Sequence, residues 1–264
     1  MKSEVQEKKL LKSEKVEKAF EIVSEKIDKF KEFVSETVDK VVEVAKEFPI
    51  PRKYPISVVS GVFILVVFWG LTFTAIFHFP FYNPLVNWMS DLGSSKLNPK
   101  GAIFFNIGCI ITGIAFFPFF LGLYEWYIGG KRNRRLTILT QISGFYCGFS
   151  MIMIGIFPED YLVVHIFWAI NLFTVSVLTF IFPSIALYRF KITRSVAKFG
   201  FISAVINFIL WLFIIPIMEW ATIILSFTFI MVIIISMQRR IDKLRFVRKQ
   251  HIEIPKKRKK SKKK

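Results

Sequence analysis

The sequence contains six long apolar segments that are almost free of charged residues. They cover residues 56–79, 101–128, 136–157, 161–188, 196–215 and 220–237. A helix needs about 20 mostly apolar residues to cross the hydrocarbon core of a bilayer. A hydrophobic content of 53% over 264 residues is also too high for a soluble domain. The sequence therefore predicts an all-α fold, a polytopic membrane bundle of six transmembrane helices within residues 56–238.

Basic residues in the short connections gather on one side of the predicted membrane. That side carries Arg52, Lys53, Lys131, Arg132, Arg134, Arg135, Arg189, Lys191, Arg194 and Lys198. The opposite side carries only Lys96 and Lys100. Because Lys and Arg are enriched in cytoplasmic loops, we expect a multi-pass protein of the cell membrane. An even number of spans then places both termini in the cytoplasm.

The net charge of +18 is concentrated outside the first 48 residues, which hold 11 Lys against 12 acidic residues. Part of the excess lies in residues 239–264, a basic cytoplasmic tail that ends KKRKKSKKK. The tail has no interleaved aromatic residues, so nucleic acid is not an expected partner. Two interpretations stay open. The tail either attracts anionic lipid headgroups, or serves as a disordered retention feature without a specific partner.

The N-terminal region, residues 1–48, is predicted to form a cytoplasmic helix. Apolar residues recur at every seventh position, at Phe20, Ile27, Val34, Val41 and Phe48. This repeat over residues 16–48 is typical of a coiled coil that would let the protein self-associate. An amphipathic helix on the membrane surface accounts for it equally well. The prolines of residues 49–55 end this helix and form a linker.

Residues 79–106 form the only long polar interruption between two apolar segments, and we expect them to make an elaborated outer loop. Polar residues of this loop and of neighbouring span ends are the candidate site. The candidate catalytic residues are His78, Asp91 and His165, and the candidate binding residues are Ser90, Asp91, Asn106, Glu159 and His165. We further expect Asp91 to contact His165 and so to hold the loop over the spans.

The chemistry of this site is not fixed by a motif. No HExxH or other metal-binding spacing occurs, and Cys109 and Cys147 both lie in apolar segments. The sequence therefore predicts no cofactor, with a divalent metal held by the histidines and carboxylates as the alternative. No catalytic motif is established, which leaves the question of enzymatic activity open.

Small and mildly polar residues replace charges inside the spans. Gly144 and Gly148 form a GxxxG pair, which predicts close contact with a neighbouring helix. The amides of Asn106, Gln141, Asn171 and Asn207 are expected to form hydrogen bonds between helices. Acidic and basic residues are absent from the middle of every span, which argues against an ion pump or a proton-coupled transporter.

Three stretches carry a resemblance to a known family: MSDLGSSKLNPKGAIFFNIGCIITGI, GIFPED and HIFWA. They resemble the domain-of-unknown-function 998 family, six-span membrane proteins of archaea and bacteria. The chain is more distantly similar to membrane proteins of the Frag/DRAM/Sfk type, which share an S-D-x-G loop before a span. The resemblance implies the topology, and it places the site at Ser90–Gly93, Asn106, Pro158 and His165. It implies no chemistry.

Three functions are compatible with these features. The first is an integral membrane protein of unknown molecular activity that works through its outer loop and interacts with lipid. The second is an outward-facing metal-dependent lipid hydrolase that uses His78, Asp91 and His165. The third is a transporter of small solutes or lipids, for which an inverted internal repeat would be expected; the sequence shows none that is convincing.

Overall fold

The computed structural model describes residues 53–126, 130–191, 193–213 and 215–261, with side chains as far as residue 246 except at residue 126. In the N-terminal region it describes six isolated residues, all helical and exposed: Glu21, Glu25, Asp28, Lys29, Glu32 and Glu36. Lys29 Nζ lies 2.6 Å from Glu25 Oε1, a pair one helical turn apart. The rest of the predicted coiled-coil or amphipathic helix lies outside the described residues, as do residues 49–52 of the linker.

Six helices of the described chain are long and apolar enough to cross a membrane. They are α2 (Ile56–Phe77), α3 (Ala102–Gly122), α4 (Lys131–Ile156), α5 (Leu162–Tyr188), α6 (Arg194–Trp211) and α7 (Pro216–Ser261). Short 3-10 helices, η1 (Ser90–Gly93), η2 (Leu123–Trp126) and η3 (Glu159–Tyr161), lie between them. This confirms the predicted all-α, six-span fold. Helix α7 continues beyond Met237, where the apolar segment ends. Hydrophobicity predicts only the part of a helix that suits lipid, and polar residues can continue the same helix.

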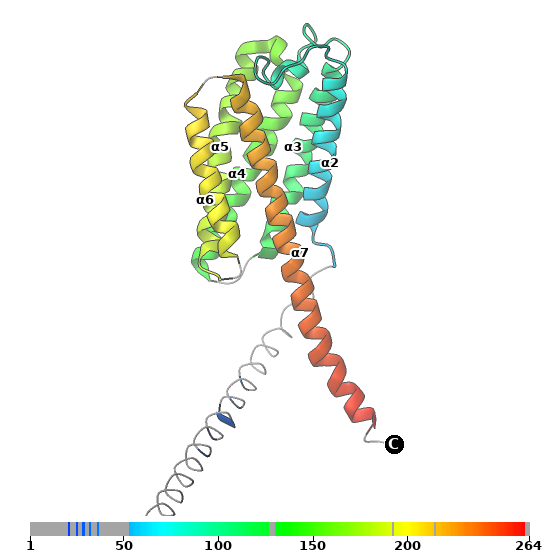
Figure 1. Cartoon of the computed structure of the whole chain (residues 1–264), viewed down its shortest axis with the longest axis vertical. Coiled ribbons are helices and arrows are strands. Elements are labelled where there is room, and N and C mark those ends of the chain that lie inside the picture. The colour runs from blue at the N-terminus through cyan, green and yellow to red at the C-terminus, as the bar shows by residue number, and fades with distance from the viewer. Residues whose placement is uncertain are drawn as a thin grey trace, which may run out of the picture. The chain divides into compact units, whose positions relative to one another are not determined.

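The helices pack in chain order, and the last one closes the bundle. Helix α2 packs on α3, α3 on α4, α4 on α5, and α5 on α6. Helix α7 contacts both ends of this series, since its Phe227 lies against α2 and the ring centroids of its Phe229 and of Phe199 in α6 are 6.2 Å apart (Figure 1). Its Phe227 ring lies 4.4 Å from that of Phe68 in α2, and its Phe229 ring lies 5.2 Å from that of Phe180 in α5. The aromatic core therefore joins the first, fourth and last spans.

The two ends of the bundle differ in composition. At one end, which we call the loop end, the α2–α3 connection lies beside the α4–α5 turn and the start of α7 (Figure 1). At the other end, which we call the basic end, are the starts of α2, α4 and α6. The basic residues named above that fall in α4, α6 and the α5–α6 connection all belong to the basic end.

Helices α3 and α4 approach each other through glycine. A Cβ atom added to Gly148 would lie 2.8 Å from the carbonyl oxygen of Gly113, and one added to Gly113 would lie 2.5 Å from that of Gly148. A Cβ atom on Gly155 would lie 2.5 Å from the carbonyl oxygen of Asn106. The two backbones are thus in contact where side chains are missing, which confirms the predicted packing of the GxxxG face against a neighbouring helix.

Three of the four intramembrane amides form hydrogen bonds between helices, as predicted. Gln141 Nε2 in α4 donates to the carbonyl oxygen of Leu121 in α3 over 3.1 Å. Asn171 Oδ1 in α5 accepts a hydrogen bond from the Tyr146 hydroxyl in α4 over 2.8 Å. Asn207 Nδ2 in α6 donates to Ser176 Oγ in α5 over 3.0 Å. Asn106 differs, because its amide bonds to the α2–α3 connection.

Candidate functional site at the loop end

The connection between α2 and α3, residues 78–101, folds into consecutive turns over the loop end. Asn83 begins one turn, with its Oδ1 accepting a hydrogen bond from the backbone N–H of Leu85 over 3.0 Å. The 3-10 helix η1 follows, and its Asp91 is buried. Asp91 Oδ2 accepts hydrogen bonds from the backbone N–H of Trp88 over 3.0 Å and from Asn87 Nδ2 over 3.2 Å. Asp91 therefore holds the turn that precedes it.

Two acidic residues from other helices bind the same connection from outside. Glu219, in the first turn of α7, accepts hydrogen bonds from the backbone N–H of Ser90 over 3.2 Å and from Ser90 Oγ over 3.3 Å. Asp160, in η3, accepts hydrogen bonds from Ser94 Oγ over 2.9 Å and from the backbone N–H of Ser95 over 2.8 Å. Carboxylates that accept backbone N–H donors form strong, charge-assisted hydrogen bonds.

Two asparagines anchor the connection to the spans on either side of it. Asn98 is fully buried, and its Nδ2 donates to the carbonyl oxygens of Ala75 over 3.1 Å and of Leu92 over 3.0 Å. Its Oδ1 accepts a hydrogen bond from the backbone N–H of Gly101, so it satisfies a donor just before α3. Asn106 Nδ2, in α3, donates to the carbonyl oxygen of Gly93 over 3.0 Å.

An aromatic pair completes the attachment to α7. The indole N–H of Trp220 donates to the Tyr82 hydroxyl over 2.8 Å, and that hydroxyl donates to the carbonyl oxygen of Trp88 over 3.0 Å. Burial raises the pKa of Tyr82, and the nearby negative charges of Glu219 and Asp91 raise it further. Tyr82 therefore remains a neutral phenol that can donate its proton in a hydrogen bond at physiological pH.

We call the bonds made by Asn98, Asn106, Asp160, Glu219 and Trp220 the loop clamp. Within the described residues, the loop clamp holds the connection over the spans, which is the role predicted for an Asp91–His165 contact. His165 is buried, and its Nδ1 bonds instead to the carbonyl oxygen of Phe157 over 2.9 Å. The hydrogen bonds of Asp91 go to Asn87 and Trp88. Each of the two residues thus fixes its own local turn.

The other candidate residues fall into two places. His78 Nδ1 bonds to the carbonyl oxygen of Thr74 over 2.8 Å, and its ring stacks on Phe104 with the centroids 5.4 Å apart. Glu159 lies beside Asp91, and its buried Oε2 has no hydrogen-bond partner among the described residues. No group of three or more His, Cys, Asp or Glu side chains in the described part of the chain is arranged to hold a metal ion.

A cavity of about 40 Å³ lies directly beneath η1. Its polar lining residues are Ser90, His165 and Glu219, and its apolar lining includes Met89, Cys109 and Met151. A void of about 10–15 Å³ already holds one water molecule. The cavity is therefore large enough for a small chemical group, and the surface that faces it is almost wholly apolar.

Nothing in the sequence pairs Tyr82 with Trp220. Aromatic residues at span ends are common because they favour the membrane interface, so neither residue stood out. Their partnership joins positions 138 residues apart. The alternation of spans predicts only that the end of α2 and the start of α7 lie on the same side of the membrane. It does not predict that Tyr82 and Trp220 are in contact.

The comparisons with known proteins agree with the fold. A family model described as "Protein of unknown function (DUF998)" matches residues 59–237. Neither a curated protein nor a solved structure matches the chain, and the more distant similarity to Frag/DRAM/Sfk-type proteins has no support. The family match covers α2 to α6, the connection that forms the candidate site, and the apolar part of α7. This integral membrane protein belongs to the DUF998 family.

Proposed function

We propose that the loop end faces the outside of the cell membrane and binds the polar head of a membrane lipid. The observation that carries this proposal is the cavity beneath η1. Ser90, His165 and Glu219 border it next to the loop, and the surface that faces the void is almost wholly apolar. Binding sites for small molecules commonly pair a mainly apolar lining with a few polar groups that fix orientation.

The distribution of charge supports this orientation. The basic connections lie at the opposite end of the bundle, which is the arrangement that the positive-inside rule favours for a cytoplasmic face. The bundle has an even number of candidate spans, so both termini would be cytoplasmic. The loop end would then lie among the headgroups of the outer leaflet.

Exposed apolar side chains at the loop end support contact with lipid. The side chain of Phe81 is 100% exposed, and those of Leu85 and Val86 are also exposed, although all three belong to a polar connection. Apolar and aromatic residues at this depth are stabilised by the interfacial region of a bilayer. A lipid that reaches the cavity would approach along this surface.

The alternative hydrolase is less well supported. It requires His78, Asp91 and His165 to act together, whereas His78 stacks on Phe104 and His165 bonds to the backbone at Phe157.

Two proposals also concern the regions beyond the bundle. Residues 16–48 would mediate self-association, and the basic tail, residues 239–264, would bind anionic headgroups without a role for nucleic acid.

Crosslinking with a photoreactive phospholipid tests the lipid-binding proposal. The full chain is reconstituted in vesicles that contain a phospholipid with the photoreactive group in its head. We expect crosslinks to concentrate in residues 85–98 and at Glu219, and an excess of unlabelled phospholipid to suppress them. A Ser90→Phe variant should lose these crosslinks by filling the cavity, whereas the control Leu97→Phe, at an exposed position outside the loop clamp, should keep them. Crosslinks spread equally over all connections would contradict the proposal.

A further inference from the structure

The interior of the bundle contains two more cavities in line with the one beneath η1. The larger, about 60 Å³, lies in the middle of the bundle between α3, α4, α5 and α7. The smaller, about 30 Å³, is lined by Asn133, Thr137 and Leu187 near the basic end. The three cavities therefore follow one another from the loop end to the basic end.

Neighbouring cavities share their walls. The cavity beneath η1 and the middle cavity are both lined by Met151, Leu172, Phe173 and Ile223. The middle cavity and the cavity near the basic end are both lined by Leu123, Thr140, Pro183 and Ile233. Single layers of side chains thus separate the voids. The unbranched side chain of Met151 is well suited to move aside, because methionine adapts readily to irregular spaces.

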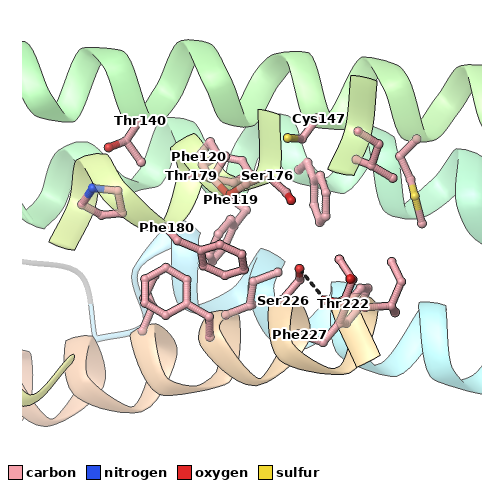
Figure 2. Close-up of a pocket in the computed structure, with 18 of the residues that line it drawn as sticks. Phe119, Phe120, Thr140, Cys147, Ser176, Thr179, Phe180, Thr222, Ser226 and Phe227 are labelled. Atoms are coloured by element: carbon pink, nitrogen blue, oxygen red, sulfur yellow. Dashed lines mark hydrogen bonds between the residues drawn. The ribbon is translucent and has the colours of Figure 1, made fainter. Parts of the chain in front are cut away.

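The wall of the middle cavity is apolar in effect, although several hydroxyl residues line it. Figure 2 shows Thr140 and Cys147 on one side and Ser226 and Phe227 of α7 on the other. Thr140 Oγ1 donates to the carbonyl oxygen of Leu136, and Ser226 Oγ donates to that of Thr222. Hydroxyl groups bonded within their own helix have no free proton to offer a ligand. Apolar cavities of this kind stay dry and take up apolar molecules.

We propose that the three cavities together accept a single hydrocarbon chain from a membrane lipid. The inference rests on the proposed function, because the polar head of the same lipid would lie beside Ser90 and Glu219 at the loop end of the series. A hydrocarbon chain fits the apolar wall, the linear order of the voids and the surrounding bilayer, which supplies such chains in abundance. The small volume of each void suits one chain and excludes a bulky ring system. Rotation of side chains, without movement of helices, would join the voids.

The chain-length dependence of binding tests the inference. Purified full-length protein, in a detergent with a bulky sterol tail, is titrated with lysophospholipids that share one head and carry chains of about 6 or about 16 carbons. We expect the longer chain to bind at least about tenfold more tightly, since burial of about two methylene groups suffices for this ratio. Equal affinity for both lengths would overturn the inference and leave the proposed function standing. Binding of neither lipid would overturn both.

A variant that fills only the middle cavity sharpens the test. Cys147→Leu places extra carbon atoms in that void, because Cys147 is buried in its wall. It should weaken binding of the long chain about tenfold and leave the short chain unaffected. The control Ile142→Phe, on a lipid-exposed position of the same helix, should change neither affinity. Should Cys147→Leu fail to fold, Ser226→Leu fills the same cavity from α7, with Ile224→Phe as its control.

The two native cysteines provide an independent readout. Cys109 lines the cavity beneath η1, Cys147 lines the middle cavity, and the chain has no other cysteine. Alkylation by the membrane-permeant reagent N-ethylmaleimide is followed by mass spectrometry. The long chain should slow modification of both residues, whereas the short chain should protect Cys109 alone. Unchanged modification of Cys147 in the presence of the bound long chain would contradict the inference.

Discussion

The indole N–H of Trp220 donates a hydrogen bond to the Tyr82 hydroxyl over 2.8 Å and so joins the last span to the connection after the first. The same hydroxyl donates to the carbonyl oxygen of Trp88. One phenol group thus links α7 to the turn that leads into η1. The loop end is held together by side chains distant in sequence, so substitutions at these residues should lower the stability of the protein.

The first prediction concerns this aromatic pair. Tyr82→Phe removes one donor and one acceptor at a partly buried position, so we expect a loss of about 1–3 kcal/mol in the free energy of unfolding. Trp220→Phe should cost a similar amount, and the double variant should cost less than the two effects added. Thermal unfolding in detergent measures all three variants. Strictly additive losses would show that the hydrogen bond contributes nothing.

The second prediction concerns Glu219, which accepts two hydrogen bonds from Ser90. Glu219→Ala leaves a backbone N–H without its carboxylate partner and should destabilise the protein by about 2–3 kcal/mol. Ser90→Ala removes only the hydroxyl bond and should cost about 1 kcal/mol. Hydrogen exchange at the amide of Ser90 should accelerate in the first variant and stay nearly unchanged in the second. Equal exchange in both would exclude Glu219 as the acceptor.

The third prediction compares two glycines. A Cβ atom at Gly148 would meet the backbone of Gly113, whereas one at Gly70 in α2 would meet nothing within 4 Å. Gly148→Ala should therefore destabilise the fold by about 1–3 kcal/mol, and Gly148→Leu by more. Gly70→Ala should be neutral or stabilising by up to about 1 kcal/mol, because alanine favours the helix. Equal thermal stabilities of Gly148→Ala and Gly70→Ala would mean that α3 and α4 do not touch there.

The fourth prediction concerns orientation in the membrane. An engineered cysteine at Ser95, in the α2–α3 connection, should react with a membrane-impermeant thiol reagent added to intact cells. One at Asn133, near the basic end, should react only after the membrane is permeabilised. The protein without an engineered cysteine gives the background from the native Cys109 and Cys147. The reverse pattern would place the loop end in the cytoplasm.

The transmembrane architecture could be predicted because it depends on local composition. The apolar segment that begins at Ile56 became a helix with the same first residue, and the glycines of α4 identified the face that meets α3. Helix ends were less predictable. Helix α4 begins at Lys131, five residues before its apolar segment, because basic residues continue a helix as well as apolar residues do.

The candidate site could be located from the sequence, but its bonds could not be assigned. Ser90, Asp91 and Glu159 do gather at the loop end, as the alternation of spans requires. Yet Glu219 is 129 residues from Ser90, and nothing in the sequence pairs them. Side-chain chemistry favours Asp91 as the partner of His165, whereas His165 Nδ1 bonds to the backbone carbonyl of Phe157, eight residues before it. A hydrogen bond to a backbone carbonyl cannot be predicted from residue types, because every residue carries the same acceptor.

The loop clamp also imposes an order on biosynthesis. Ser90 is made 129 residues before the carboxylate that binds it, a delay on the order of 10 seconds at ordinary translation rates. During that interval the N–H and Oγ of Ser90 lack the carboxylate that later accepts their hydrogen bonds. The connection therefore acquires its last hydrogen bonds only when α7 is made, and a chain interrupted before residue 216 lacks both Glu219 and Trp220.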